Sequence, residues 1–389
     1  MIGLGGAGGK ALERAAAAMP AGCADCVAID TDFAALAQLP RCRPIEIGAA
    51  RFEGLGSAGD KAGSAKALAE SADLREIFGS ARIAVITAGL GKGGAGLLPP
   101  ILDAAYARNI PVLCVLTTPF AFEPRETARS AEETLDAIAD KPGCCLAVIS
   151  NDALAAPPDA PADDAAADTA ATLRASLDRA SAALAAWLSL LWKMTSLHGP
   201  DNLNLGEAAL TDILRRGAGA CHLGFATATG PYRVKTAMRR MLARDGAGIG
   251  AHASQARALL VGITGGADLL LREVAETMSA FTTYIPLGAT DRIRMGTILD
   301  PLSDGALSIA AIAFDDWRDQ IQTESDPDEL EMDAPAAPAR GLANSRSGKT
   351  LKRKPAETTK FSGTAPMIIN DEDLDKPTYL RRRLNIDLS

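Results

Sequence analysis

Short apolar runs alternate with longer amphipathic stretches through the first 150 residues of the chain. Four runs are rich in aliphatic side chains and short enough to be buried strands, and they cover residues 26–29, 82–86, 112–116 and 145–149. A polar or glycine-rich turn follows each run, and helical spacing fills much of the sequence between them. This alternation predicts an α/β fold with a doubly wound sheet, which would bind its ligand at the carboxyl ends of the strands.

The pattern changes after residue 172. Residues 173–198 carry apolar side chains on most faces of a helix, which predicts one long helix buried between two domains. Apolar runs then recur at residues 259–264, 294–299 and 307–314. We therefore expect a nucleotide-binding domain over residues 1–172, the central helix over 173–198 and a second, smaller α/β domain over 199–318.

The remaining sequence has a different composition. Residues 319–372 are rich in Pro, Ala, Ser and charged residues, which predicts a disordered linker. Residues 373–389 combine apolar and basic side chains, including Pro377, Tyr379, Leu380, Arg381 and Arg382. An amphipathic segment after a flexible linker is typical of a peptide that folds on its partner.

The most glycine-rich segment, residues 87–99, reads TAGLGKGGAGLLP and joins an expected strand to an expected helix. This arrangement aims backbone N–H groups and a helix N-terminus at a phosphate. Glycines lack Cβ atoms, so the backbone can turn tightly and an anion can approach it closely. Five glycines are more than a tight turn needs, and the segment therefore predicts a phosphate-binding loop.

Two further glycine loops occur upstream. The first lies within residues 3–9 and precedes Lys10, and the second lies within residues 54–60. Gly3, Gly5 and Gly8 form a GxGxxG, and Asp30 closes the next strand, which is the pattern of a dinucleotide-binding domain. Only Met1 and Ile2 precede this loop, so either its strand is vestigial or the true start of the chain lies upstream. An oxidoreductase would leave the other two loops unexplained.

Composition narrows the function classes. The 389 residues carry a formal net charge of −8, and the pI is about 5.1, which argues against binding to nucleic acid. No apolar run approaches the roughly 20 residues that span a bilayer, so we expect a cytoplasmic protein without direct membrane insertion. Cys23 and Cys26 form a CxxC without a second pair at metal-ligand spacing. We therefore expect core thiols and no protein-bound metal site.

The three glycine loops, long helix, second domain and terminal peptide together resemble the plan of FtsZ, the bacterial tubulin homologue. The resemblance covers nearly the whole chain. Its motifs, with the family's versions in parentheses, are residues 30–32 (NTD), 54–59 (GLGAGG), 87–96 (the tubulin signature loop), 119–123 (PFxFE), 150–152 (PND), 263–269 (ITGGEDL), 296–300 (GTVID) and the terminal residues 375–382.

The resemblance implies GTP or GDP as ligand, with Mg²⁺ as its cation, and head-to-tail polymerisation into a ring at the division site. It also implies that the terminal peptide binds an FtsA-type membrane tether or other division proteins. By the matching motifs, the nucleotide-binding residues are Gly5, Gly6, Gly8, Gly9, Lys10, Gly56, Gly59, Gly89, Gly91, Lys92, Gly93, Gly94, Ala95, Gly96, Glu123, Arg125 and Asn151.

The acidic loop departs from the family pattern. In the family, two aspartates of N-x-D-F-x-D reach the next subunit's nucleotide and orient the attacking water. Here these positions fall at Gly206 and Ala209. Glu207 and Asp212 lie nearby and are the candidate catalytic substitutes, although we favour an interpretation as helix-start and surface acids. This departure from the family pattern therefore predicts weak or absent GTP hydrolysis.

Other positions of the expected site also differ. The signature loop has lost its threonines, and Lys92 is either a point charge on phosphate or a solvated lysine. The family's base-reading aspartate falls near Ser181 or Ala183, so guanine specificity is in question. We favour an assembling protein with weak or absent hydrolysis. The alternatives are an active GTPase that uses Glu207 and Asp212, and a non-polymerising regulator of another FtsZ.

Overall fold

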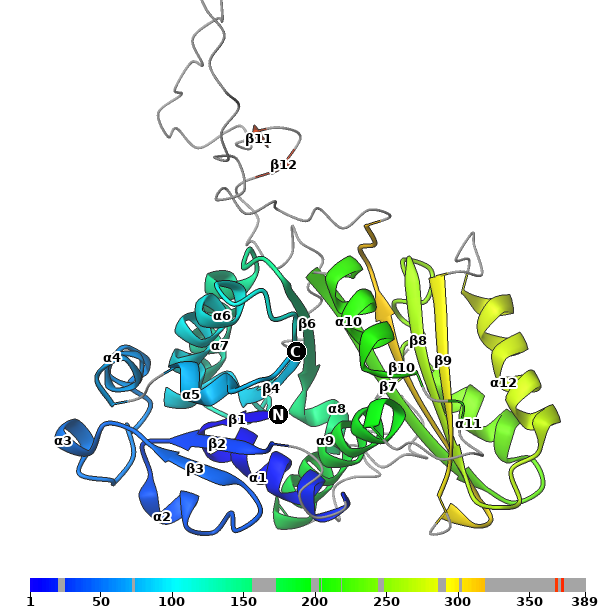
Figure 1. Cartoon of the computed structure of the whole chain (residues 1–389), viewed down its shortest axis with the longest axis horizontal. Helices are drawn as coiled ribbons and strands as arrows, with labels where there is room; N and C mark the ends of the chain where they lie inside the picture. The colour runs from blue at the N-terminus through cyan, green and yellow to red at the C-terminus, as the bar shows by residue number, and fades with distance from the viewer. Residues whose placement is uncertain are drawn as a thin grey trace, which may run out of the picture. The chain divides into compact units, whose positions relative to one another are not determined.

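A computed structural model describes most of the first 318 residues and two short parts of the tail (Figure 1). The described residues are 1–19, 25–71, 74–155, 173–196, 203, 205–217, 219–243, 248–285, 292–300, 303–318, 368–369 and 372–373. The chain divides into a large unit, residues 1–319 with 376–389, and a small unit, residues 320–375. The small unit's described strands, β11 (Ile368–Ile369) and β12 (Glu372–Asp373), pair antiparallel. The expected linker and docking peptide otherwise lie outside the described residues.

The first domain contains six parallel strands in the order β3-β2-β1-β4-β5-β6. This order reverses at β1, as in a doubly wound sheet, so the carboxyl ends of the strands meet at one edge. The strands are β1 (Ile2–Leu4), β2 (Val27–Asp30), β3 (Arg43–Glu46), β4 (Ala84–Gly89), β5 (Val112–Thr118) and β6 (Cys144–Ser150). All four strands expected in this region are confirmed, because their aliphatic runs are buried on both faces.

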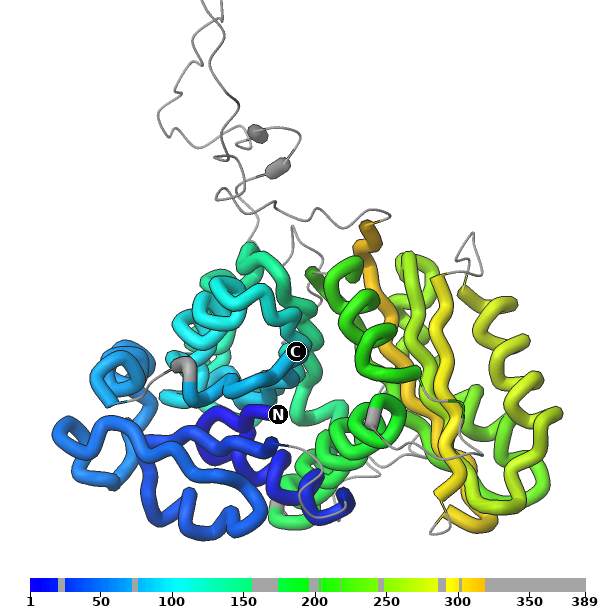
Figure 2. The backbone as a smooth tube through the Cα atoms, viewed as in Figure 1, coloured from blue at the N-terminus to red at the C-terminus, as the bar shows by residue number. Residues whose placement is uncertain are grey.

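Helices cover both faces of this sheet, as the backbone trace in Figure 2 shows. They are α1 (Gly5–Ala17), α2 (Phe33–Leu36), α3 (Ala49–Phe52), α4 (Lys61–Ser71), α5 (Leu74–Phe78), the 3₁₀ helix η1 (Gly93–Leu97), α6 (Leu98–Tyr106), α7 (Arg125–Ile138) and α8 (Asn151–Ala155). One core lies between the sheet and α4, α6 and α7, whereas α1 packs on the opposite face with α9 (Leu173–Ser196).

The long helix α9 confirms the expected central helix. Trp187, Leu188 and Leu191 are nearly fully buried in a core that contains residues of both domains. Near the end of the helix, Lys193 Nζ lies 2.5 Å from the carboxylate of Asp300, which follows β9 (Ile293–Leu299) of the second domain. The wide apolar cover of this helix therefore reflects packing against two domains.

The second domain adds four strands, β7 (Gly219–Thr229), β8 (Ala258–Gly265), β9 (Ile293–Leu299) and β10 (Ala306–Phe314), in the order β7-β10-β8-β9. β7 also pairs with β6, so the strands of the large unit form one ten-stranded sheet. The described helices that follow α9 are α10 (Glu207–Arg216), α11 (Arg233–Met241) and α12 (Leu271–Tyr284). None of the described helices is long and apolar enough to cross a membrane.

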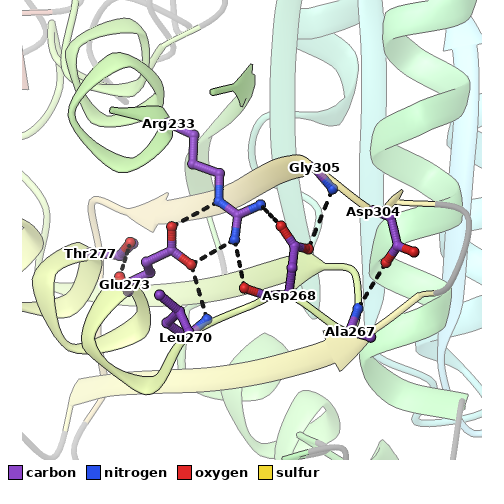
Figure 3. Close-up of polar contacts among 8 residues, drawn as sticks. All are labelled: Arg233, Ala267, Asp268, Leu270, Glu273, Thr277, Asp304 and Gly305. Carbon is purple, nitrogen blue, oxygen red and sulfur yellow. Dashed lines mark hydrogen bonds and ion pairs between the residues drawn. The ribbon is translucent and has the colours of Figure 1, made fainter. Parts of the chain in front are cut away.

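A charged network joins the start of α11 to the turn between β8 and α12 (Figure 3). The guanidinium of Arg233 donates to both carboxylate oxygens of Glu273, at 2.8 and 2.7 Å, and to Asp268 Oδ2 at 2.6 Å. Arg233 lowers the pKa of both carboxyl groups by hydrogen bonding. The turn is also held by Asp304, whose Oδ1 accepts from Ala267 N. The motif of residues 263–269 therefore has a structural role in this domain.

Candidate nucleotide-binding site

The N-terminus of α1 lies open at the carboxyl edge of the first sheet. Strand β1 ends at Leu4 and the helix begins at Gly5, whose φ of +66° suits glycine. No side chain caps the helix, so N–H groups of its first turn remain available to an anion. The expected first loop is thus wrong in detail. Gly3 belongs to β1, and Gly6, Gly8 and Gly9 lie inside the helix, because strand and helix join without an intervening loop.

The glycines of α1 have different surroundings. A Cβ on Gly8 would lie 2.2 Å from the carbonyl oxygen of Thr87, and one on Gly9 would lie 2.8 Å from Leu39 Cδ1. Packing against backbone therefore explains Gly8, whereas a side chain at Gly9 would displace only the end of the Leu39 side chain. A Cβ on Gly6 would meet only Asp30 Oδ2, at 4.0 Å, and the neighbouring Ala7 is exposed. Gly6 and Ala7 thus leave room for a ligand at the first turn, while Lys10 is exposed one turn further on.

The signature loop is held by close backbone packing on three sides. A Cβ on Gly94 would lie 2.8 Å from Gly5 Cα, and one on Gly96 would lie 2.2 Å from Lys61 O. A Cβ on Gly93 would lie 1.9 Å from Ser57 Oγ, which belongs to the second glycine loop. The signature loop therefore contacts both of the other glycine loops. These positions therefore require glycine for steric reasons, which the sequence alone does not show.

Gly89 and Gly91, the other two glycines of this loop, are also tightly packed. A Cβ on Gly91 would lie 2.2 Å from Thr127 Cγ2, and one on Gly89 would lie 3.1 Å from Ala7 Cβ. Ala95 is fully buried, whereas the Lys92 side chain is 77% exposed. Lys92 is thus the one side chain that projects from residues 91–96, all of which the structure describes.

The second glycine loop packs along residues 30–32. Gly56 N donates to Thr31 O, and Asp32 forms an isolated bridge with Leu55. Gly56 and Gly59 have φ values of +87° and +93°, which favour glycine. Nothing lies within 4 Å of a Cβ built on Gly59, so its requirement for glycine is conformational.

Asp30 brings a carboxylate close to the open end of α1. Its Oδ1 accepts from the backbone N–H groups of Thr31, at 2.7 Å, and Asp32, at 3.2 Å. Burial raises the pKa of the Asp30 carboxyl, and the two hydrogen bonds oppose that shift. From the sequence alone, Asp30 was predicted only as part of a motif. Its position at the end of a strand, next to the glycine-rich start of a helix, could have marked it as a residue of the site.

The residues expected at the ribose and base lie after β5 and β6. Glu123 is 20% exposed, and its Oε1 accepts from Phe120 N at 3.0 Å. Its Oε2 lies 3.8 Å from Lys92 Nζ. Arg125 and Asn151 are the first residues of α7 and α8. The strand order therefore brings Glu123, Lys92 and Arg125 to the same edge as α1, because β4 and β5 are adjacent.

The acidic-loop candidates are separated on α10. Glu207 is the first residue of the helix and is exposed, and Gly206 before it has φ +75°. Asp212 forms an ion pair with Arg216 at 2.8 Å. At 100° per residue, five positions place Glu207 and Asp212 on different faces of the helix. Asp201, just upstream, lies outside the described residues, and the described part of this region brings no pair of carboxylates together.

The remaining chemistry of the described residues is limited. They contain no cluster of three or more side chains that could hold a metal ion. Cys26, Cys42, Cys114, Cys144, Cys145 and Cys221 are buried free thiols, and Cys23 lies outside the described residues. Burial raises the pKa of Cys42 and Cys144 to about 12, so these groups are not activated nucleophiles.

These features define a class of protein: a two-domain α/β chain with contacting glycine loops at the carboxyl edge of a parallel sheet and a long helix between the domains. Residues 1–157 match the model of the Tubulin/FtsZ family, GTPase domain, and residues 219–315 match that of the FtsZ family, C-terminal domain. Together the matches cover more than half of the sequence. The chain belongs to the tubulin/FtsZ family.

Relatives and solved structures agree with this assignment. Cell division protein FtsZ of Azotobacter vinelandii is 26% identical over 405 aligned positions, covering 98% of this chain and 96% of that protein. Cell division protein FtsZ 2 of Rhizobium meliloti is 28% identical over 318 positions, covering 80% and 86%. An empty FtsZ dimer of M. jannaschii has a TM-score of 0.68 at 22% identity, over 80% of this chain and 86% of that one. A GTPγS-bound protofilament of CetZ2 from Haloferax volcanii has a TM-score of 0.60 at 22% identity, over 80% and 91%.

Proposed function

We propose that this chain is a divergent FtsZ-like cytoskeletal protein of cell division that binds GTP or GDP, assembles head to tail, and hydrolyses GTP weakly or not at all. Nucleotide binding is supported by the uncapped first turn of α1 beside Gly6 and by the glycine-rich signature loop that contacts it. The family match over residues 1–157 supports the choice of a guanine nucleotide. Bound Mg²⁺ would neutralise phosphate charge, and the carboxylate of Asp30, whose Oδ2 lies 4.0 Å from the position of a Cβ on Gly6, lies beside the open turn.

The start of α10 carries the proposal of weak hydrolysis. Attack of water on the γ-phosphate needs a positioned general base, which contributes roughly 10²–10⁴-fold. Gly206 and Ala209 offer no carboxylate, and Asp212 is neutralised by Arg216. Glu207 remains as a single exposed acid. The active-GTPase alternative therefore depends on one residue and not on a pair.

Assembly and docking rest on the relatives and on the sequence. The two FtsZ relatives are named as cell division proteins, and the chain spans most of their length. We assign self-assembly to the two domains of residues 1–318. We assign partner docking, to an FtsA-type tether or another division protein at the division site, to the peptide containing Tyr379 and Leu380. Substituting both residues by alanine should abolish binding of the tether without changing the amount of polymer that sediments.

One experiment tests the central proposal. The purified full-length chain is titrated with labelled GTP, GDP and ATP, and phosphate release and sedimentation are followed in the same samples. We expect guanine-selective binding, a GTP-dependent pellet and little phosphate release. Rapid release that is lost in Glu207→Ala would instead favour the active GTPase, and binding without a pellet would favour a non-polymerising regulator. Absence of guanine-nucleotide binding would refute the proposal.

A further inference from the structure

The ion pair between Lys92 and Glu123 joins two loops that face the candidate nucleotide site. Lys92 Nζ lies 3.8 Å from Glu123 Oε2, and the lysine side chain is 77% exposed. An ion pair this exposed and this long contributes little to stability. Lys92 can therefore leave Glu123 at small cost.

Glu123 is held in place independently of Lys92. Its Oε1 accepts from Phe120 N at 3.0 Å, and its own backbone N–H donates to Phe120 O at 2.9 Å. The turn thus fixes the carboxylate when the lysine moves away. In contrast, the described contacts of the Lys92 ammonium consist of the ion pair alone.

The backbone around Lys92 is fixed at the first turn of α1. Gly94, two residues later, packs directly on Gly5. Gly89, three residues earlier, lies beside Ala7. Lys92 therefore stands on a rigid loop that wraps the open helix end, and its flexible four-carbon stem carries a positive charge at the rim of that site.

From this placement we infer that Lys92 is a phosphate-reading residue that exchanges partners: it pairs with Glu123 in the empty site and with the polyphosphate tail of a bound nucleotide. The inference rests on the proposed nucleotide binding and deepens it. A lysine is a point charge on phosphate, so its contribution depends on how many phosphate charges the ligand carries. The exchange also frees the carboxylate of Glu123 to accept a hydrogen bond from a hydroxyl group of the ligand.

The test compares ligands of different phosphate number on the full-length chain. GTP, GDP, GMP and inorganic tripolyphosphate are titrated against the wild type, Lys92→Met and Lys92→Arg. A charged hydrogen bond of ordinary strength corresponds to about a ten-fold change in affinity or more. We therefore expect Lys92→Met to weaken GTP and tripolyphosphate at least about ten-fold and to leave GMP within about two-fold, whereas Lys92→Arg retains most of the affinity.

Two further variants separate phosphate recognition by Lys92 from a general effect of charge on ligand binding. Lys66→Met removes an exposed positive charge from α4, outside the signature loop, and should leave all four affinities unchanged. Glu123→Gln removes the competing partner and should leave or strengthen tripolyphosphate binding. Melting temperatures of the lysine variants should equal that of the wild type, because both lysines are exposed.

The outcomes distinguish this inference from the proposed function. If Lys92→Met weakens GTP and GMP equally, or neither, Lys92 does not read phosphate and the inference fails while nucleotide binding stands. If the wild type binds tripolyphosphate in a Lys92-dependent manner but binds no GTP, the inference stands and the proposed function fails. If the wild type binds none of the four ligands, both fail.

Discussion

The imidazole rings of His222 and His252 stack face to face, with their centroids 3.5 Å apart and their planes inclined by 3°. His222 lies on β7, and His252 lies in the turn that follows α11. His222 Nε2 is 3.0 Å from Asp315 Oδ2, and the other oxygen of this buried carboxylate has no hydrogen-bond partner among the described residues. The parallel planes prevent the ring nitrogens from converging on one metal ion. The described residues form no metal-binding cluster here.

This stack predicts a contribution to the free energy of unfolding that is lost at acidic pH. Burial, together with the neighbouring His222, lowers the pKa of His252 to about 4. In the unfolded chain the group would titrate near 6.5, so between these values the unfolded state binds more protons. The free energy of unfolding should therefore fall as the pH drops from about 6.5 to about 4, by at most about 3 kcal/mol from this residue.

Comparison with His252→Phe isolates that term, because phenylalanine keeps a flat ring on His222 and cannot titrate. Urea unfolding at several pH values should show a shallower decline for the variant across this window. The comparison is needed because Asp268 and Glu273, whose pKa values Arg233 lowers, also lose stabilisation at acidic pH. Parallel curves for the two proteins would contradict the prediction.

A second prediction concerns the charged network of Figure 3. Arg233→Met leaves the buried carboxylate of Glu273 without its cation, and breaking a buried pair from one side costs about 3–5 kcal/mol. Arg233→Met combined with Glu273→Met removes both charges and should recover part of this loss. Chemical unfolding of the single and double variants measures the difference. A double variant less stable than Arg233→Met would show that the pair is not the dominant interaction.

A third prediction separates packing glycines from ligand-facing ones. Gly8→Ala forces a Cβ against Thr87 O and should destabilise the first domain by about 1–3 kcal/mol. Gly6→Ala meets no close contact and should raise helix stability by up to about 1 kcal/mol. If phosphate binds at the first turn of α1, Gly6→Ala should nevertheless weaken GTP. Thermal unfolding and GTP titration of this matched pair test the site, and an unchanged GTP affinity in Gly6→Ala would place the phosphate elsewhere.

The sequence predicted most of the first sheet because runs such as residues 112–116 are aliphatic throughout and buried on both faces. It did not predict β7, whose Gly, Ala, His and Thr residues give little hydrophobic contrast, nor β3, which is short and largely polar. It also could not separate Gly6 from Gly8, because the contact that requires Gly8 is made by Thr87, far away along the chain. Long-range packing, and not local pattern, decides which glycines remain open to a ligand.

Some contacts of the candidate site could have been predicted from the sequence. Asp212 and Arg216 are four residues apart, which is the spacing of a helical ion pair, so the sequence already offered a reason to doubt Asp212 as a catalytic acid. The ion pair of Lys92 and Glu123 could not be predicted from sequence spacing, because it forms only when β4 and β5 lie side by side.

A final prediction addresses the proposed loss of hydrolysis. Ala209 lies in the first turn of α10, where an aspartate is favoured by the helix dipole, so Ala209→Asp should fold normally. Gly206 has φ +75°, and an aspartate there would be strained, so Ala209 is the better position for restoring an acid. If the missing carboxylate limits hydrolysis, Ala209→Asp should raise GTP-dependent phosphate release at least about ten-fold under conditions where polymer forms. Ala208→Asp places the same charge in the same turn on a different face and serves as the matched control. Equal rates in the two variants would show that charge alone, and not a positioned acid, accounts for any gain.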